Sequence, residues 1–148
     1  MSTHVTDQRD YRRDLRIEAR REQVFQALTT LEGLASWWTP LVEGSPTIGS
    51  EMTFAFEGVD EAIVMRVDES RADIVKWTCL VHTGHPEWES TAIAFQLHEP
   101  NDKTTLLKFR HHGLVPTLDC YLACEHGWNH FLNSLAGYAE RGEGTPFS

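Results

Sequence analysis

The last third of the chain holds the feature that most restricts its fold, a run with helical periodicity from Thr117 to Arg141. Residues of one face recur there at steps of three and four. This face carries one carboxylate among apolar groups and comprises Leu118, Tyr121, Glu125, Trp128, Leu132, Leu135 and Ala139. Thr117 is expected to cap the N-terminus, and Gly142 is a typical C-terminal stop. A helix of about 37 Å, at 1.5 Å per residue, needs a broad apolar surface to cover it. The rest of the chain is therefore expected to supply a sheet.

Most of the remaining chain alternates apolar and polar residues, which is typical of half-buried strands. The strands are expected at 13–20, 52–56, 63–67, 74–81, 89–98 and 104–112. Two short helices are expected at 21–31 and 31–38, and residues 40–50 are predicted to form a loop. The order β-α-α-β-β-β-β-β-α indicates an α+β fold, in which a curved six-stranded antiparallel sheet wraps around the long C-terminal helix. Gly127 and Gly137 inside that helix suggest a close approach of backbone or of an aromatic ring, and the alternative is a plain reduction in helix stability.

The bulk properties indicate a single domain at 12–148 behind a polar tail at 1–11. The net charge of -9 argues against a nucleic-acid partner, which requires a basic surface. We see neither an apolar run of the roughly 20 residues that a membrane span needs nor a signal peptide, so we expect a cytoplasmic protein. The three cysteines, Cys79, Cys120 and Cys124, do not indicate a disulfide framework.

Three segments resemble one known family: IEARREQVFQALTTLEGLASWW at 17–38, PLVEGSPTIGSEMTFAF at 40–56 and GWNHFLNSLAGYAERGEGTPF at 127–147. They are similar to SRPBCC proteins, the START-like or helix-grip superfamily. Within it they resemble the branch related to the C-terminal domain of the activator of the 90-kDa heat-shock protein ATPase. The resemblance implies a helix-grip fold with a cavity between the sheet and the long helix. The superfamily binds many hydrophobic ligands, includes polyketide cyclases, and has no shared catalytic signature to transfer, so function must be argued from the site.

Aromatic residues occur in nearly every predicted element, and those near the open end of the grip would line an apolar pocket. The candidate cavity residues are Trp38, Phe54, Phe56, Met65, Trp77, Phe95, Phe109, His111, Tyr121, Glu125 and Trp128. Three of these are polar. Glu125 either faces the cavity as an acid or base or reaches the rim and solvent. His111 and Tyr121 either contact a ligand or serve packing at the strand end and on the helix face.

The eight histidines raise the question of a metal site. His126 and His130 share a helix face opposite the apolar one, where solvated histidines are the better interpretation. His82 or His85 could meet His111 and Cys120 to form a mixed nitrogen and sulfur site if loop and strand ends converge. No pair of these residues has a firm ligand spacing. We therefore expect no metal and no cofactor.

The sequence thus predicts a protein that binds a small hydrophobic molecule between sheet and helix. Two alternatives stay open. One is an interaction module that acts on a chaperone ATPase, and the other is an enzyme of the polyketide cyclase or dehydratase type using Glu125, His111 or Tyr121. A homodimer is plausible for the family, but no sequence feature requires one.

Overall fold

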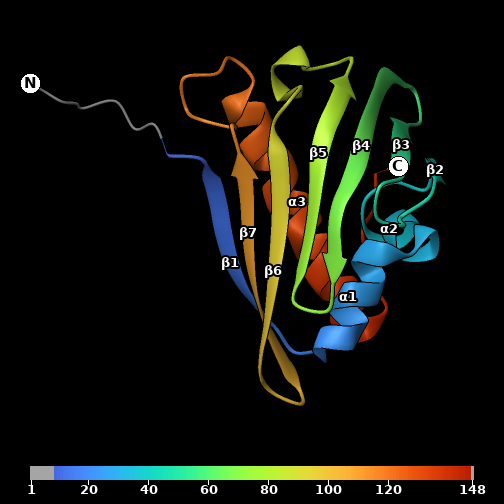
Figure 1. The fold of residues 1–148 in the computed structure, drawn as a ribbon, viewed down its shortest axis with the longest axis vertical. Coiled ribbons are helices and arrows are strands. Elements are labelled where there is room, and N and C mark those ends of the chain that lie inside the picture. The colour runs from blue at the N-terminus through green and yellow to red at the C-terminus, as the bar shows by residue number, and fades with distance from the viewer. Residues whose placement is uncertain (1–8, 148) are drawn as a thin grey trace, which may run out of the picture.

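One antiparallel sheet of seven strands forms the body of the computed structural model, which describes residues 9–147 (Figure 1). The strand order is β1-β7-β6-β5-β4-β3-β2. The strands are β1 (Tyr11–Ile17), β2 (Val42–Gly44), β3 (Glu51–Phe56), β4 (Val59–Arg71), β5 (Ile74–His82), β6 (Ala92–Asn101) and β7 (Thr104–His112). The helices are α1 (Arg21–Thr29), α2 (Leu31–Trp37), the 3-10 turn η1 (Pro86–Trp88) and α3 (Tyr121–Arg141).

The predicted α+β class is confirmed, and the predicted count of six strands was wrong. The additional strand is β2, which lies inside the segment predicted to be a loop and pairs with β3. It has only three residues, too few to show an alternating pattern. Gly44 ends it with φ of 103°, and a Cβ there would overlap the carbonyl oxygen of Glu51. A glycine is therefore required for this edge strand to turn back.

Helix α3 crosses the face of the sheet, as the periodicity predicted, but it starts later than expected (Figure 1). Pro116 is followed by turns, and Cys120 rather than Thr117 is the N-cap residue, without a side-chain hydrogen bond. The C-terminal end is at Arg141, as predicted. Gly142 has φ of 72°, and its N–H donates to the carbonyl of Tyr138 at 2.8 Å.

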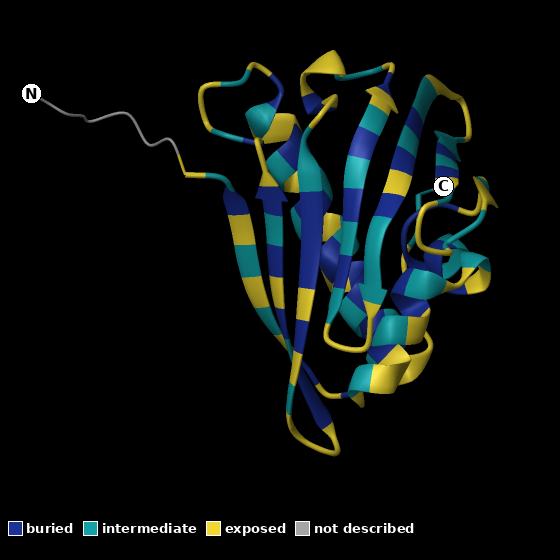
Figure 2. Ribbon diagram, viewed as in Figure 1, coloured by how far each residue is buried: buried dark blue, intermediate teal, exposed yellow. Residues whose placement is uncertain are grey.

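The strands also differ from the expected boundaries at the hairpin ends. The first strand begins at Tyr11, the last residue of the predicted tail, and residues 1–8 of that tail lie outside the described part of the chain. Strand β4 is 13 residues long because its hairpin with β5 extends well beyond the predicted alternation. Buried and exposed residues alternate along β1 and β7, so one face of the sheet is covered (Figure 2).

The core lies between this covered face and the three helices. Its fully buried large side chains include Trp37, Trp77, Phe95, Phe109 and Leu107. Helices α1 and α2 pack beside the C-terminal half of α3, where Ser134 Oγ donates to the carbonyl of Trp37 at 2.8 Å (Figure 1). No helix among residues 9–147 is both long and apolar enough to span a membrane. The opposite half of α3 faces the segment between β5 and β6, and the candidate site lies there.

Candidate functional site

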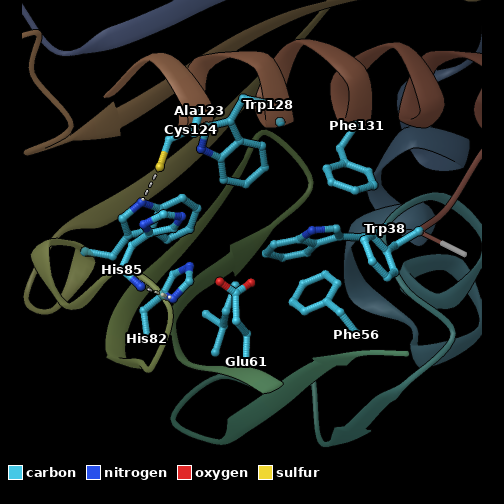
Figure 3. A pocket seen from close by; sticks show the side chains of 13 residues that line it. Trp38, Phe56, Glu61, His82, His85, Ala123, Cys124, Trp128 and Phe131 are labelled. Carbon is cyan, nitrogen blue, oxygen red and sulfur yellow. Dashed lines mark hydrogen bonds between the residues drawn. The ribbon is translucent and has the colours of Figure 1, made fainter. Parts of the chain in front are cut away.

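A cavity of about 310 Å³ lies between the N-terminal half of α3 and the ends of β3, β4 and β5 (Figure 3). Its lining is mainly aromatic and aliphatic, with a few polar groups gathered toward the segment 82–88. The lining residues are Trp38, Phe56, Glu61, Ile63, His82, His85, Trp88, Ala123, Cys124, Gly127, Trp128, Phe131 and Phe147. This combination of apolar walls and few polar groups is typical of small-molecule sites.

The apolar wall is fixed by aromatic packing around Trp38. Its ring lies 4.3 Å from Phe54 and 5.4 Å from Trp128, between centroids, so sheet and helix meet through this residue. The chain after α3 returns to the same place. The Phe147 N–H donates to the carbonyl of Trp38 at 2.8 Å, and its ring packs against Phe56 at 5.2 Å. The C-terminal segment thus forms one side of the cavity.

A β-bulge directs His82 toward the cavity. Val64 pairs with Val81 and Met65 pairs with Cys79, so β5 carries one extra residue, Leu80, at this point. The insertion reverses the alternation, with the result that His82 is buried and Val81 is 37% exposed. Periodicity alone would have placed His82 in the loop or on the outer face.

The His82 ring is a neutral hydrogen-bond acceptor. Its Nδ1 accepts from the backbone N–H groups of Gly84 at 3.2 Å and of His85 at 2.9 Å, which leaves the proton on Nε2. Burial, and then the neighbouring His85 ring, lower the pKa of His82 from 6.5 to about 4. The ring therefore organises the turn that carries His85.

His111 lies beneath the cavity, fully buried, and contacts two indole rings, those of Trp88 and Trp128. Its Nδ1 accepts from Trp128 Nε1 at 3.0 Å, and its Nε2 lies 2.8 Å from Thr91 Oγ1. The Thr91 hydroxyl donates to the carbonyl of Trp88, so the Nε2 proton of His111 is donated to that hydroxyl. Burial lowers the pKa of His111 from 6.5 to about 3. The neutral ring therefore holds the Trp128 indole by a hydrogen bond and the Trp88 backbone carbonyl through Thr91, while the Trp88 indole packs edge-on against it at 4.6 Å between centroids.

Two cysteines and a histidine meet at the polar end of the cavity. The Nδ1 or Nε2 of His85 and the Sγ atoms of Cys120 and Cys124 lie within 4.8 Å of one another. Trp88 Nε1 donates to Cys124 Sγ at 3.1 Å. Burial raises the pKa of Cys124 to about 12 and that of Cys120 above its ordinary value, so both are thiols in the protein without a metal.

The candidate residues named from the sequence fall into three groups. Three of them line the cavity: Trp38, Phe56 and Trp128. Five pack in the core behind it: Phe54, Met65, Trp77, Phe95 and Phe109. The three acid or base candidates are not among the lining residues. His111 is buried below the cavity. Tyr121 and Glu125 lie near Tyr11 of β1, whose pKa is raised by burial and then by these two neighbours.

Sequence reasoning missed several cavity residues because their positions depend on tertiary structure. Glu61 was in no predicted strand. Its carboxylate packs against Gly84, and a Cβ on residue 84 would overlap this carboxylate. Phe147 follows the last helix and carries no periodic signal. Cys124 was assigned to the edge of the buried helix face, which is where it lies, but the loop residue that it meets was not predictable.

Gly127 faces the cavity and contradicts the expected close approach. Apart from its chain neighbours and the backbone of its own helix, a Cβ at this position would have no atom within 4 Å. At Gly137 the expectation holds in part, because a Cβ would lie 2.7 Å from the carbonyl oxygen of Glu143, which is backbone and not an aromatic ring. One helix glycine therefore leaves space, and the other permits packing.

Known proteins match this chain in sequence and in fold. A family model described as Activator of Hsp90 ATPase homolog 1-like protein matches residues 18–140. The chain is similar to the solution structure of the Aha1 dimer from Colwellia psychrerythraea, with 31% identity and a TM-score of 0.79 over 91% of this chain and 98% of that chain.

More distant structures share the fold. The protein SSP2350 from Staphylococcus saprophyticus is 19% identical with a TM-score of 0.72, over 94% of this chain and 97% of that chain. CalU16 from Micromonospora echinospora is 19% identical with a TM-score of 0.68, over 97% of this chain and 78% of that chain. A comparison with curated proteins gave no significant match. The chain belongs to the Activator of Hsp90 ATPase homolog 1-like family, an Aha1-like branch of the SRPBCC superfamily.

Proposed function

We propose that this protein binds a small, flat, hydrophobic molecule in the cavity beside α3. The observation that carries the proposal is the cavity of about 310 Å³ with aromatic walls from Trp38, Trp88 and Trp128. That volume is twice the roughly 150 Å³ of an engineered apolar cavity that accepts benzene. A molecule with two fused rings therefore matches the space.

The polar groups at one end define how such a molecule would be oriented. Glu61 and His85 line the same end of the cavity as the buried ring of His82 (Figure 3). A ligand hydroxyl placed there would find a carboxylate acceptor, while its rings stack on indole. We therefore expect an aromatic ligand that carries a hydroxyl or similar donor.

The first test is native mass spectrometry of the freshly purified protein, with an organic extract of the denatured sample. We expect a bound aromatic molecule with few charges. The purified protein is then titrated with naphthol, a two-ring probe, by calorimetry and tryptophan fluorescence. A clean mass of the protein alone together with no naphthol binding would contradict the proposal.

A second candidate is an interaction with the 90-kDa chaperone, favoured by the family description and by the 31% identity to an Aha1 protein. It predicts that the purified chain raises the ATPase rate of the chaperone from the same cell. An unchanged ATPase rate would contradict this second candidate.

We also expect the chain, like that relative, to form a homodimer, which sedimentation would test.

A further inference from the structure

The cluster of His85, Cys120 and Cys124 forms a set of metal ligands at the polar end of the cavity. We propose that these three side chains bind a thiophilic ion, with Zn²⁺ as the ion that fits the set. Two thiolates and an imidazole are ligands that zinc prefers. Neither the family resemblance nor the proposed hydrophobic ligand contributes to this inference, because it rests on the three side chains alone.

The spacing of the three ligand atoms is close to that of a zinc site. Bond lengths of 2.3 Å to sulfur and 2.0–2.1 Å to nitrogen place tetrahedral ligand atoms about 3.8 Å apart or slightly less. The observed atoms lie within 4.8 Å of one another, so a shift of about 1 Å would close the site. Rotation about χ1 of either cysteine, or a small movement of the His85 turn, supplies such a shift.

The backbone places the two sulfur atoms together. Cys120 is the N-cap of α3 and Cys124 lies one turn later, where the Cys124 N–H donates to the carbonyl of Cys120 at 2.9 Å. Residues four apart share a helix face, so both thiols point toward the same loop. Pro86 restricts the backbone next to His85, and the hydrogen bond to His82 Nδ1 holds the His85 N–H.

Three features favour thiolates at this position once a metal ion is bound. The N-terminus of α3 has no side-chain cap and no acidic residue in its first turn, so the partial positive charge of its free N–H groups is available to a thiolate. Trp88 Nε1 donates to Cys124 Sγ, and an N–H that donates to a sulfur ligand stabilises its thiolate form. Finally, zinc with two thiolates and a neutral imidazole has no net charge, which suits ligands that are largely buried.

The binding step balances in protons. Each cysteine S–H loses its proton to solvent as the zinc–sulfur bond forms, and His85 binds through a neutral ring nitrogen, so two protons leave for each Zn²⁺ bound. Burial, together with the nearby carboxylate of Glu87, raises the pKa of both thiols, so protons compete with the metal and binding weakens as the pH falls. His85 and Cys124 also line the cavity, so a fourth coordination position would open toward it.

The test is a titration of the full chain, first reduced and stripped with a chelator, with Co²⁺ and then Zn²⁺. We expect one Co²⁺ per chain, with thiolate-to-cobalt charge transfer and the strong visible absorption of a tetrahedral site. Zn²⁺ should displace the cobalt and abolish both bands. Wild-type protein that lacks thiolate-to-cobalt absorption would overturn the proposal.

The ligand variants are Cys120→Ser with Cys124→Ser, and His85→Ala. The double cysteine variant should lose the charge-transfer band. His85→Ala should weaken zinc binding by at least about 10–100-fold, which is the cost of losing a group that only hydrogen-bonds a metal ligand. His85 is partly exposed, so its replacement leaves the fold intact, which circular dichroism checks.

Two matched controls separate this site from other histidines and thiols. His126→Ala removes an exposed histidine of α3, and Cys79→Ala removes the third cysteine, which lies in β5. Both should retain wild-type zinc affinity. Unchanged affinity in the ligand variants, or equal loss in His126→Ala, would contradict the assignment. Naphthol binding is measured separately on metal-free protein, so failure of either proposal is recognised independently.

Discussion

The two halves of α3 serve different purposes although they belong to one continuous helix. The C-terminal half packs against α1 and α2, with Leu132 and Leu135 fully buried. The N-terminal half faces the cavity, and Gly127 presents an empty surface to it. Sequence periodicity makes no distinction between them, because both carry the same apolar face. One absent side chain, at Gly127, and not a break in the helix therefore leaves the room for a ligand.

The largest expected effect on stability comes from loss of packing in the C-terminal half of α3. Leu135→Ala removes a fully buried side chain next to α1 and α2 and should lower the free energy of unfolding by about 2–5 kcal/mol. Phe131→Ala, at the partly exposed cavity wall, should cost clearly less despite deleting a larger side chain. Urea unfolding of both variants makes the measurement. An equal or larger loss for Phe131→Ala would show that the two halves are packed alike.

The free energy of unfolding should depend on pH through His111, which is buried beneath the cavity. The pKa of His111 is near 6.5 in the unfolded chain and about 3 in the folded one, so between these values the unfolded chain binds the extra proton. Stability is therefore complete above pH 6.5 and falls as the pH decreases, by about 1.4 kcal/mol per pH unit. Between pH 6.5 and 5 this amounts to about 2 kcal/mol.

The variant His111→Gln isolates this contribution. Its unfolding free energy should be lower at pH 7, where the hydrogen bonds to Trp128 and Thr91 are lost or weakened, yet fall less between pH 6.5 and 5. Urea titrations at both pH values compare the two slopes. Identical slopes for wild type and variant would mean that His111 does not stay neutral in the folded state.

The two helix glycines offer the most direct comparison of the halves. Gly127→Ala meets no atom and should raise the free energy of unfolding by about 1 kcal/mol through helix propensity. Gly137→Ala places a Cβ 2.7 Å from the carbonyl of Glu143 and should cost about 1–3 kcal/mol, because backbone must move. Thermal unfolding of the pair measures both effects. Changes of the same sign would contradict the distinction between space and packing.

The sequence was sufficient for the features set by local physics. The face of α3, its end at Gly142, and β7 at 104–112 follow from periodicity and cap chemistry, and the structure has them. The features that define the site depend on distant parts of the chain. His82 is turned inward by a bulge in β5, and Phe147 closes one side through a bond to the carbonyl of Trp38. Neither an inserted residue nor a returning C-terminal segment leaves a periodic signal.

The Tyr121 and Glu125 predictions show the same limit within a single helix. Both lie on the apolar face by count of residues, yet a face of this width has two sides. In the orientation that α3 adopts, Cys124, Gly127 and Phe131 face the cavity, whereas Glu125 lies on the side of β1. A small rotation about the helix axis, which periodicity does not fix, decides which side chains reach a ligand.

The most direct test of the account is naphthol affinity in Gly127→Leu. The new side chain would enter the cavity without meeting other atoms near its Cβ, so the fold should persist while the space is filled. His126→Leu adds the same side chain one residue away, at an exposed position, and serves as the control. We predict that Gly127→Leu loses naphthol binding and that His126→Leu retains it. Equal affinity in wild type and Gly127→Leu would contradict the claim that this half of α3 is built around a ligand.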